Sequence, residues 1–146
     1  MTGHVNPDAD GWKLFKSLPR SEPIHMLNLV RLRRLAEYPA GHPDHGKGLT
    51  GQEAYRAYGR ATAPLLQRLG GRVVWTGRPQ AMVTGPQSEA WDLAFVAEYP
   101  DAAAFLAMVS DLEYREHVQH RTAAVEDSRL LRLAPLVPGE GFGEQG

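Results

Sequence analysis

The 146-residue chain contains no cysteine. It therefore has no disulfide framework, no thiolate nucleophile, no iron–sulfur cluster and no thiolate zinc site. Charge of one sign is not in excess either, because 16 Lys and Arg residues stand against 17 Asp and Glu residues. A nucleic-acid backbone is held by a positive field that this composition does not provide. We therefore expect no nucleic-acid partner.

Long apolar runs are also missing. No segment approaches the roughly 18 apolar residues that a membrane-spanning helix requires. Residues 1–10 include His4, Asn6, Pro7 and two aspartates, whereas a signal peptide has a basic start and an apolar run. We therefore expect a cytoplasmic protein without a membrane partner.

The composition divides the chain into three parts. We predict an N-terminal arm at 1–23, a single domain at 24–135 and a flexible tail at 136–146, where Pro138 is followed by four glycines. Within the domain, residues 36–48 include two prolines and three glycines. This stretch is therefore predicted to be a long loop.

The spacing of apolar residues and of turn formers predicts the secondary structure. Thr50-Gly-Gln-Glu53 has the spacing of a capping box, so a helix is expected to begin there and to end at Gly70-Gly71. Pro64 is expected to kink this helix or to begin its second half. The predicted elements are a short helix at 10–17, a strand at 24–32, a helix at 50–69, strands at 72–77, 81–84 and 91–99, adjoining helices at 101–110 and 110–125, and a strand at 128–133.

Without the N-terminal helix and the short 81–84 strand, the order is strand, helix, strand, strand, helix, strand. This βαββαβ order is that of the ferredoxin-like α+β fold, with a four-stranded antiparallel sheet and helices on one face. Trp75, Trp91 and the apolar strand at 24–32 would leave too much apolar surface on the other face of a monomer. We therefore expect a homodimer in which a second sheet covers this face.

The best constellation of reactive side chains lies in the predicted helix at 110–125. Tyr114, His117 and Arg121 are spaced i, i+3 and i+7 and share one helix face, with His120 beside them. Imidazole can shuttle a proton near neutral pH, and guanidinium can hold a carboxylate or enolate. His117 and Arg121 are our catalytic candidates, and Tyr114 and His120 are candidates for substrate binding.

A structural interpretation of the same helix stays open. In it, Arg121 pairs with Glu126, Asp127 or a carbonyl of the first strand, and His117 and His120 cap a solvated helix face.

Further candidates for substrate binding come from three other elements. Asn28 interrupts an apolar strand and must bond to something, because a buried amide without a partner costs about 1–3 kcal/mol. Arg31 lies on the opposite side of that strand and is expected to pair with a carboxylate. Tyr55 and Tyr58 could line a cleft between helix and sheet, with Trp75 stacking a planar ligand. The alternatives are that Asn28 pins a sheet edge or loop and that the aromatic residues fill the core.

The stretch His42-Pro-Asp-His45 offers two imidazoles and a carboxylate, which can bind metals. The signal is weak, because no second His or Cys pair follows at metal-binding spacing. The glycine series lack the spacing of phosphate-binding loops, and no Gly-x-Ser-x-Gly elbow is present. We therefore expect neither a metal nor a cofactor.

Several blocks of the sequence resemble a known family, domain-of-unknown-function family 1330 (DUF1330), small proteins of the dimeric α/β-barrel superfamily. The resemblance extends from residue 24 to residue 134. It implies a ferredoxin-like protomer and face-to-face pairing of two sheets. The blocks are Met26-Leu-Asn-Leu29, Glu53-Ala-Tyr-Arg-Ala-Tyr58, Gly70-Gly-Arg-Val-Val-Trp-Thr-Gly77, Trp91-Asp92, Tyr99-Pro100 with Phe105, Tyr114-Arg-Glu-His117, His120-Arg121 and Ser128-Arg129-Leu130.

The superfamily does not select one function, because its members include cofactor-independent monooxygenases, lactone isomerases, haem-degrading enzymes and proteins without known chemistry. Haem handling is disfavoured, because His117 and His120 lack a further distinguishing signature. We expect a small organic ligand, aromatic or keto-acid-like, in a cleft of the dimeric barrel, with cofactor-independent isomerase or monooxygenase chemistry as the reaction such a site could perform. The alternative is a non-catalytic dimeric structural or regulatory module, so whether the chain is an enzyme stays open.

Overall fold

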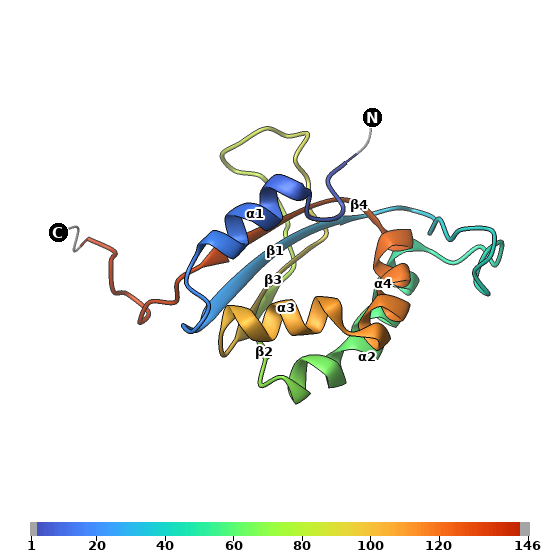
Figure 1. Cartoon of the computed structure of the whole chain (residues 1–146). Helices are drawn as coiled ribbons and strands as arrows, with labels where there is room; N and C mark the ends of the chain where they lie inside the picture. The colour runs from blue at the N-terminus through green and yellow to red at the C-terminus, as the bar shows by residue number, and fades with distance from the viewer. Residues whose placement is uncertain (1–2, 144–146) are drawn as a thin grey trace.

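The computed structural model describes residues 3–143, which form a four-stranded antiparallel sheet with helices packed on one face (Figure 1). The strand order is β2-β3-β1-β4, so the first and third strands of the chain are central. In chain order the elements are α1 (Ala9–Ser17), β1 (Ile24–Leu32), α2 (Gly51–Arg68), β2 (Arg72–Gly77), β3 (Leu93–Tyr99), α3 (Ala102–Ser110), α4 (Leu112–Ala124) and β4 (Val125–Leu133). The predicted ferredoxin-like α+β fold with an additional N-terminal helix is confirmed.

The start of α2 follows the predicted capping box. The Thr50 hydroxyl accepts a hydrogen bond from the Glu53 amide, and the Glu53 carboxylate accepts one from the Thr50 amide, both at 3.0 Å. Two amides that the helix itself cannot pair are thus satisfied. Pro64 lies inside α2 and does not end it.

The start of α4 differs from the prediction by one residue. Asp111, not Ser110, is the N-cap, and its carboxylate accepts the amides of Glu113 and Tyr114. Asp111 has an extended backbone that ends α3, so the same residue separates the two helices.

The register of β1 determines which residues face the helices. Asn28 lies opposite Phe95 of β3 and Leu130 of β4. Because side chains alternate along a strand, Ile24, Met26 and Val30 point to the same face as Asn28. These three are 2%, 3% and 0% exposed, so this face holds the core.

The core consists of two apolar clusters. One gathers around Met26 with Phe105 of α3 and Phe15 of α1, whose ring centroids lie 5.1 Å apart. The predicted N-terminal arm therefore packs against the domain through α1. The second cluster surrounds Val30 and includes Tyr38 from the loop between β1 and α2.

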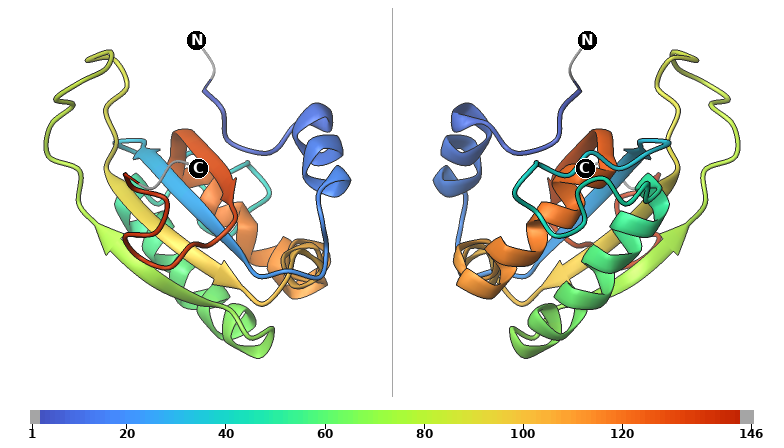
Figure 2. Two further views of the ribbon diagram at one scale, coloured as in Figure 1. Left: turned by 90° about the vertical axis from the view of Figure 1, so that its left-hand side faces the viewer. Right: turned by 90° about the vertical axis from the view of Figure 1, so that its right-hand side faces the viewer.

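No described element covers the other face of the sheet (Figure 2). Its middle carries a row of apolar side chains, one from each strand, which we call the apolar band: Trp75, Val96, Leu27 and Leu131. Trp75 is 53% exposed and Leu131 is 56% exposed.

Ionic groups border the apolar band at both ends. At one end the Glu98 carboxylate contacts His25 at 2.8 Å and Arg72 at 3.1 Å. At the other end Arg31 contacts Glu126 at 2.9 Å. The predictions that Arg31 faces away from Asn28 and pairs with a carboxylate are thus confirmed.

Three predicted strands differ in the structure. Residues 81–84 are not a strand but belong to a loop between β2 and β3, where Val83 is 91% exposed. This loop extends away from the sheet (Figure 2), so its backbone has no neighbouring strand to pair with. β3 begins at Leu93, two residues later than predicted, and β4 begins at Val125, directly after α4.

Across residues 3–143, no helix combines the length and the apolarity needed to cross a bilayer. The predicted boundaries of the arm, domain and tail stay a prediction, and their extreme ends, 1–2 and 144–146, lie outside the described residues.

Two valines provide a matched test of the core. Val30→Ala removes fully buried methyl groups, and we expect it to lower the free energy of unfolding by about 2 kcal/mol or more. Val83→Ala makes the same chemical change at an exposed position and should alter stability by less than about 0.5 kcal/mol. Urea denaturation followed by circular dichroism measures both. Equal losses would contradict the placement of Val30 in the core.

Candidate functional site

A group of tyrosines lies where α2 packs on α4. The hydroxyls of Tyr58 and Tyr114 are 2.9 Å apart and hydrogen-bonded, and the rings of Tyr55 and Tyr58 are 5.4 Å apart. The Arg121 guanidinium lies beside the Tyr55 phenol and completes the group, which we call the tyrosine seam. It lies between the two apolar clusters, because Tyr114 packs on the cluster around Met26 and Tyr55 on the cluster around Val30.

Arg121 is held without a charged partner. Its guanidinium donates to the Val5 carbonyl and, at 3.3 Å, to the Ser128 hydroxyl. Within the described part of the chain it makes no ion pair, and Glu126 and Asp127 contact Arg31 instead. Arg121 is therefore a half-buried cation whose charge no carboxylate of residues 3–143 neutralises.

Two phenols of the seam, those of Tyr55 and Tyr58, stay neutral over a wide pH range. Burial raises the pKa of Tyr55 to about 12, and the positive charge of Arg121 opposes this rise. Burial also raises the pKa of Tyr58 well above its ordinary value. At neutral pH both groups are hydrogen-bond donors rather than phenolates.

Asn28 shares the helix-covered face but not the hydrogen bonds of the seam. Its amide nitrogen donates to the Met26 carbonyl at 3.0 Å, which satisfies it within its own strand.

The two histidines of α4 have different surroundings. The His117 imidazole makes no hydrogen bond to any residue from 3 to 143, and its ring stacks 6.3 Å from that of His120. His120 Nδ1 lies 2.7 Å from the Tyr38 hydroxyl and 4.0 Å from a carboxylate oxygen of Asp44. Burial lowers the pKa of His120, so this imidazole is neutral at neutral pH. The His120 side chain therefore contacts the loop at 36–49 rather than the tyrosine seam.

The position of Trp75 contradicts the prediction that this residue shares a pocket with Asn28 and Tyr55. The pairing of β2 with β3 shifts between Val73 and Trp75, which leaves Val74 as an extra residue. Such a bulge reverses the alternation beyond it. Trp75 consequently pairs with Val96 on the face opposite Phe95 and Asn28.

A pocket of about 630 Å³ opens at the edge of the sheet where α2 begins. We call it the arginine pocket, because Arg33, Arg34, Arg56 and Arg78 line it. Its remaining lining residues are Leu32, Thr50, Gln52, Tyr55, Asp92 and Leu93.

The charges of this pocket are largely unpaired. Arg33 contacts Glu37 at 3.4 Å, but Arg34, Arg56 and Arg78 make no ion pair within residues 3–143. The one carboxylate in the lining, that of Asp92, accepts the Leu32 amide at 2.8 Å. The pocket therefore carries a positive potential suited to an anion.

Our sequence reasoning missed these arginines, although a signal was present. β1 and β2 both run antiparallel to β3 and are thus parallel to each other. Arg33 and Arg34 directly follow β1 and Arg78 directly follows β2, so the topology brings them to the same edge of the sheet. Of the predicted site residues, Tyr55 alone lines this pocket.

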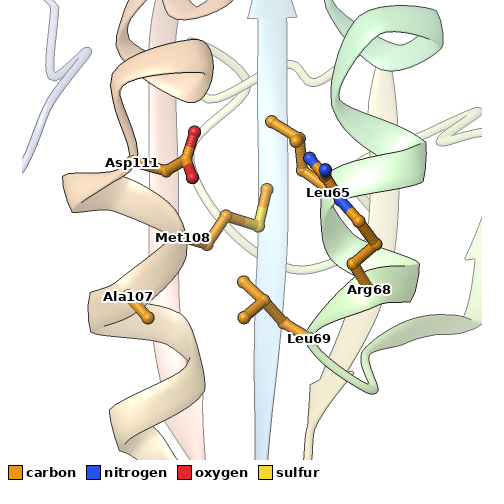
Figure 3. A pocket seen from close by; sticks show the side chains of 6 residues that line it. All are labelled: Leu65, Arg68, Leu69, Ala107, Met108 and Asp111. Carbon is orange, nitrogen blue, oxygen red and sulfur yellow. The ribbon is translucent and has the colours of Figure 1, made fainter.

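A second, smaller pocket lies between α2 and α3 (Figure 3). Met108 and Leu69 point into the space between the helices, and Arg68 and Asp111 lie at its sides. Its volume is about 140 Å³, well below the several hundred Å³ of typical ligand sites. We therefore regard it as a packing crevice.

Comparisons with known proteins agree with this fold. The family model described as Domain of unknown function (DUF1330) matches residues 48–132. The methylated RPA0582 protein is 55% identical with a TM-score of 0.87, and the match covers 96% of this chain and 100% of that one. RPA0582 from Rhodopseudomonas palustris, a protein of unknown function, is 54% identical in a second crystal structure with a TM-score of 0.85, covering 94% and 100% of the two chains. No curated protein matches the sequence.

The raised pKa of Tyr55 predicts a loss of stability at alkaline pH. The folded protein keeps this phenol neutral up to about pH 12, whereas the unfolded chain ionises it near pH 10. The contribution of this phenol to the free energy of unfolding is therefore fully present below about pH 10 and is lost as pH rises toward 12. Between pH 8 and pH 11, wild type should lose about 1 kcal/mol more than Tyr55→Phe in urea denaturation. Identical losses in the two proteins would refute this burial.

Proposed function

The chain belongs to the DUF1330 family, and since that name states no function, we propose one from its residues: the protein binds a small organic anion in the arginine pocket. The observation that carries the proposal is a pocket of about 630 Å³ lined by three arginines that make no ion pair with any residue from 3 to 143. Guanidinium groups bind carboxylates through two parallel hydrogen bonds. A carboxylate is therefore the ligand group that this lining fits best.

The apolar part of the lining narrows the ligand class. Tyr55, Leu32 and Leu93 provide an aromatic ring and two aliphatic side chains beside the arginines. A molecule with a carboxylate at one end and an apolar body at the other would satisfy both parts. Aromatic and keto-acid-like anions have this character.

Catalysis is the finer part of the proposal. Tyr55 lines the pocket on one side and lies near Arg121 on the other, so it connects the ligand to the tyrosine seam. In an isomerisation, His117 would remove a proton beside a carbonyl and return it to another atom, while Arg121 held the enolate. Asn28, Tyr58 and Tyr114 would support His117 and Arg121 in this reaction. Neither His117 nor Arg121 lines the pocket, so turnover requires Tyr55 to move.

A specific observation favours the non-catalytic alternative. No buried side-chain nitrogen or oxygen in the described residues lacks a hydrogen-bond partner. In the non-catalytic alternative, the tyrosine seam is a structural network, and the protein is a dimeric binding or regulatory module.

We also propose that two copies pair through the apolar band. Four apolar side chains in a row across the sheet, bordered by ionic groups at both ends, suit a second copy related by two-fold symmetry. The apolar bands of the two copies would contact each other at the centre of such an interface, which supports the proposal of a dimeric α/β barrel.

Ligand binding can be tested with phenylpyruvate, an aromatic 2-oxo acid, and with phenylacetone, which lacks the carboxylate. We expect calorimetry to detect phenylpyruvate binding at one site per protomer and much weaker binding of phenylacetone. Arg56→Gln and Arg78→Gln should each weaken phenylpyruvate binding at least about tenfold, a loss of about 1.4 kcal/mol.

Arg60→Gln is the matched control, because Arg60 lies one turn further along α2, makes no ion pair within the described chain and does not line the pocket. An equal effect of Arg60→Gln and Arg56→Gln, or equal binding of both compounds, would contradict a specific carboxylate site.

The dimer can be tested by Trp75→Glu. This residue is 53% exposed in the protomer, so folding should persist while a buried charge disrupts the interface. Light scattering should give twice the protomer mass for wild type. The dissociation constant of the variant dimer should be at least about 30-fold higher, which corresponds to a loss of about 2 kcal/mol in the free energy of dimerisation. Val83→Glu, on the exposed loop, should leave the dimer intact. A monomeric wild type at micromolar concentration would end this proposal.

A further inference from the structure

The loop before α2 and the last turns of α4 bring three metal-binding side chains together. His42 and Asp44 come from the loop and His120 from α4. One potential ligand atom from each lies within 4.8 Å of the other two. All three residues are partly buried, unlike the scattered acidic groups of a protein surface.

The loop is held in place by backbone hydrogen bonds on both sides. The Glu37 amide donates to the Ala123 carbonyl of α4 at 2.9 Å, and the Ala36 amide donates to the Leu49 carbonyl at 2.8 Å. These bonds attach the ends of the loop to the domain. The positions of His42 and Asp44 relative to α4 are therefore part of the fold.

Side-chain contacts orient the three groups further. Tyr38 is only 7% exposed, its ring stacks on His42 with centroids 4.5 Å apart, and its hydroxyl meets His120 Nδ1 at 2.7 Å. Lys47 donates to Asp44 Oδ1 at 3.0 Å, while Oδ2 faces His120. One carboxylate oxygen is thus occupied and the other points to the imidazole.

We propose that His42, Asp44 and His120 form a binding site for one divalent transition metal ion of the zinc type in each protomer. Two imidazoles and one carboxylate are a donor set that such ions prefer, whereas calcium and magnesium prefer oxygen alone. Three protein ligands leave a position for water or for an oxygen of a small molecule.

The geometry requires a small contraction. Two ligand atoms on a tetrahedral zinc lie about 3.4 Å apart, given bonds of about 2.1 Å. His120 Nδ1 lies 4.0 Å from Asp44 Oδ2, and the three ligand atoms lie within 4.8 Å of one another, so side-chain rotations would have to shorten these distances by up to about 1.4 Å. Coordination through His120 Nδ1 would replace its hydrogen bond with the Tyr38 hydroxyl, and coordination through His42 Nδ1 would replace the bond that the Asp44 amide donates at 3.0 Å.

Zinc binding by the full chain, without a polyhistidine tag, tests the site. Competition with a chromogenic chelator should give one zinc ion per protomer. His42→Gln, His120→Gln and the isosteric Asp44→Asn should each weaken binding at least about tenfold. Cobalt(II) in place of zinc should give the visible absorption of a bound ion with nitrogen ligands, and this absorption should be lost in the same variants.

Two other histidines serve as controls. His45 lies in the same loop but uses Nδ1 to donate to the Tyr38 carbonyl, and His25 lies on the opposite face of the sheet beside Glu98. His45→Gln and His25→Gln should bind zinc as wild type does. Thermal unfolding without metal confirms that each variant is folded, and Asp44→Asn serves if a histidine variant is not.

A wild-type stoichiometry of zero would overturn the site, and so would unchanged zinc affinity in the folded Asp44→Asn and His120→Gln variants. Loss of binding in His25→Gln but not in His120→Gln would place the ion elsewhere and would equally overturn it.

Discussion

The pairing of β1 with both β3 and β4 is the interaction on which the rest of the structure depends. It places Ile24, Met26 and Val30 against the helices and Leu27 in the apolar band on the opposite face. A shift by one residue would bring His25 and Arg31 into the core, at the cost of burying charge. The register is therefore specified by the hydrophobic effect on one face and by ionic contacts on the other.

The same sheet order explains why several arginines gather at one edge of the sheet. β1 and β2 run parallel, so the residues that follow them lie at the same end, and α2 begins there. Like charges so placed repel each other, and solvent reduces this repulsion because the pocket is open. The anion that we propose as ligand would reduce this repulsion and thereby stabilise the folded protein.

Helix α4 serves two different groups of residues through consecutive positions. Arg121 lies in the tyrosine seam, whereas His120 faces Tyr38 and Asp44 in the loop. Because successive residues of a helix point about 100° apart, one helix can present both. A change in the position of α4 would therefore alter both groups at once.

The sequence by itself determined the local features. The capping box at Thr50, the strand at 24–32 and the opposite orientations of Asn28 and Arg31 depend on neighbouring residues and on strand alternation, and all are present in the structure. The order of the elements was enough to predict the ferredoxin-like fold.

Only the tertiary structure decided the rest. A bulge that leaves Val74 unpaired moves Trp75 to the other face, and residues 81–84 lack a strand to pair with. His120 lies near Asp44, and Arg78 lines the same pocket as Arg34, although long stretches of sequence separate the two residues of each pair. Such contacts depend on the packing of whole elements, and no local periodicity encodes them.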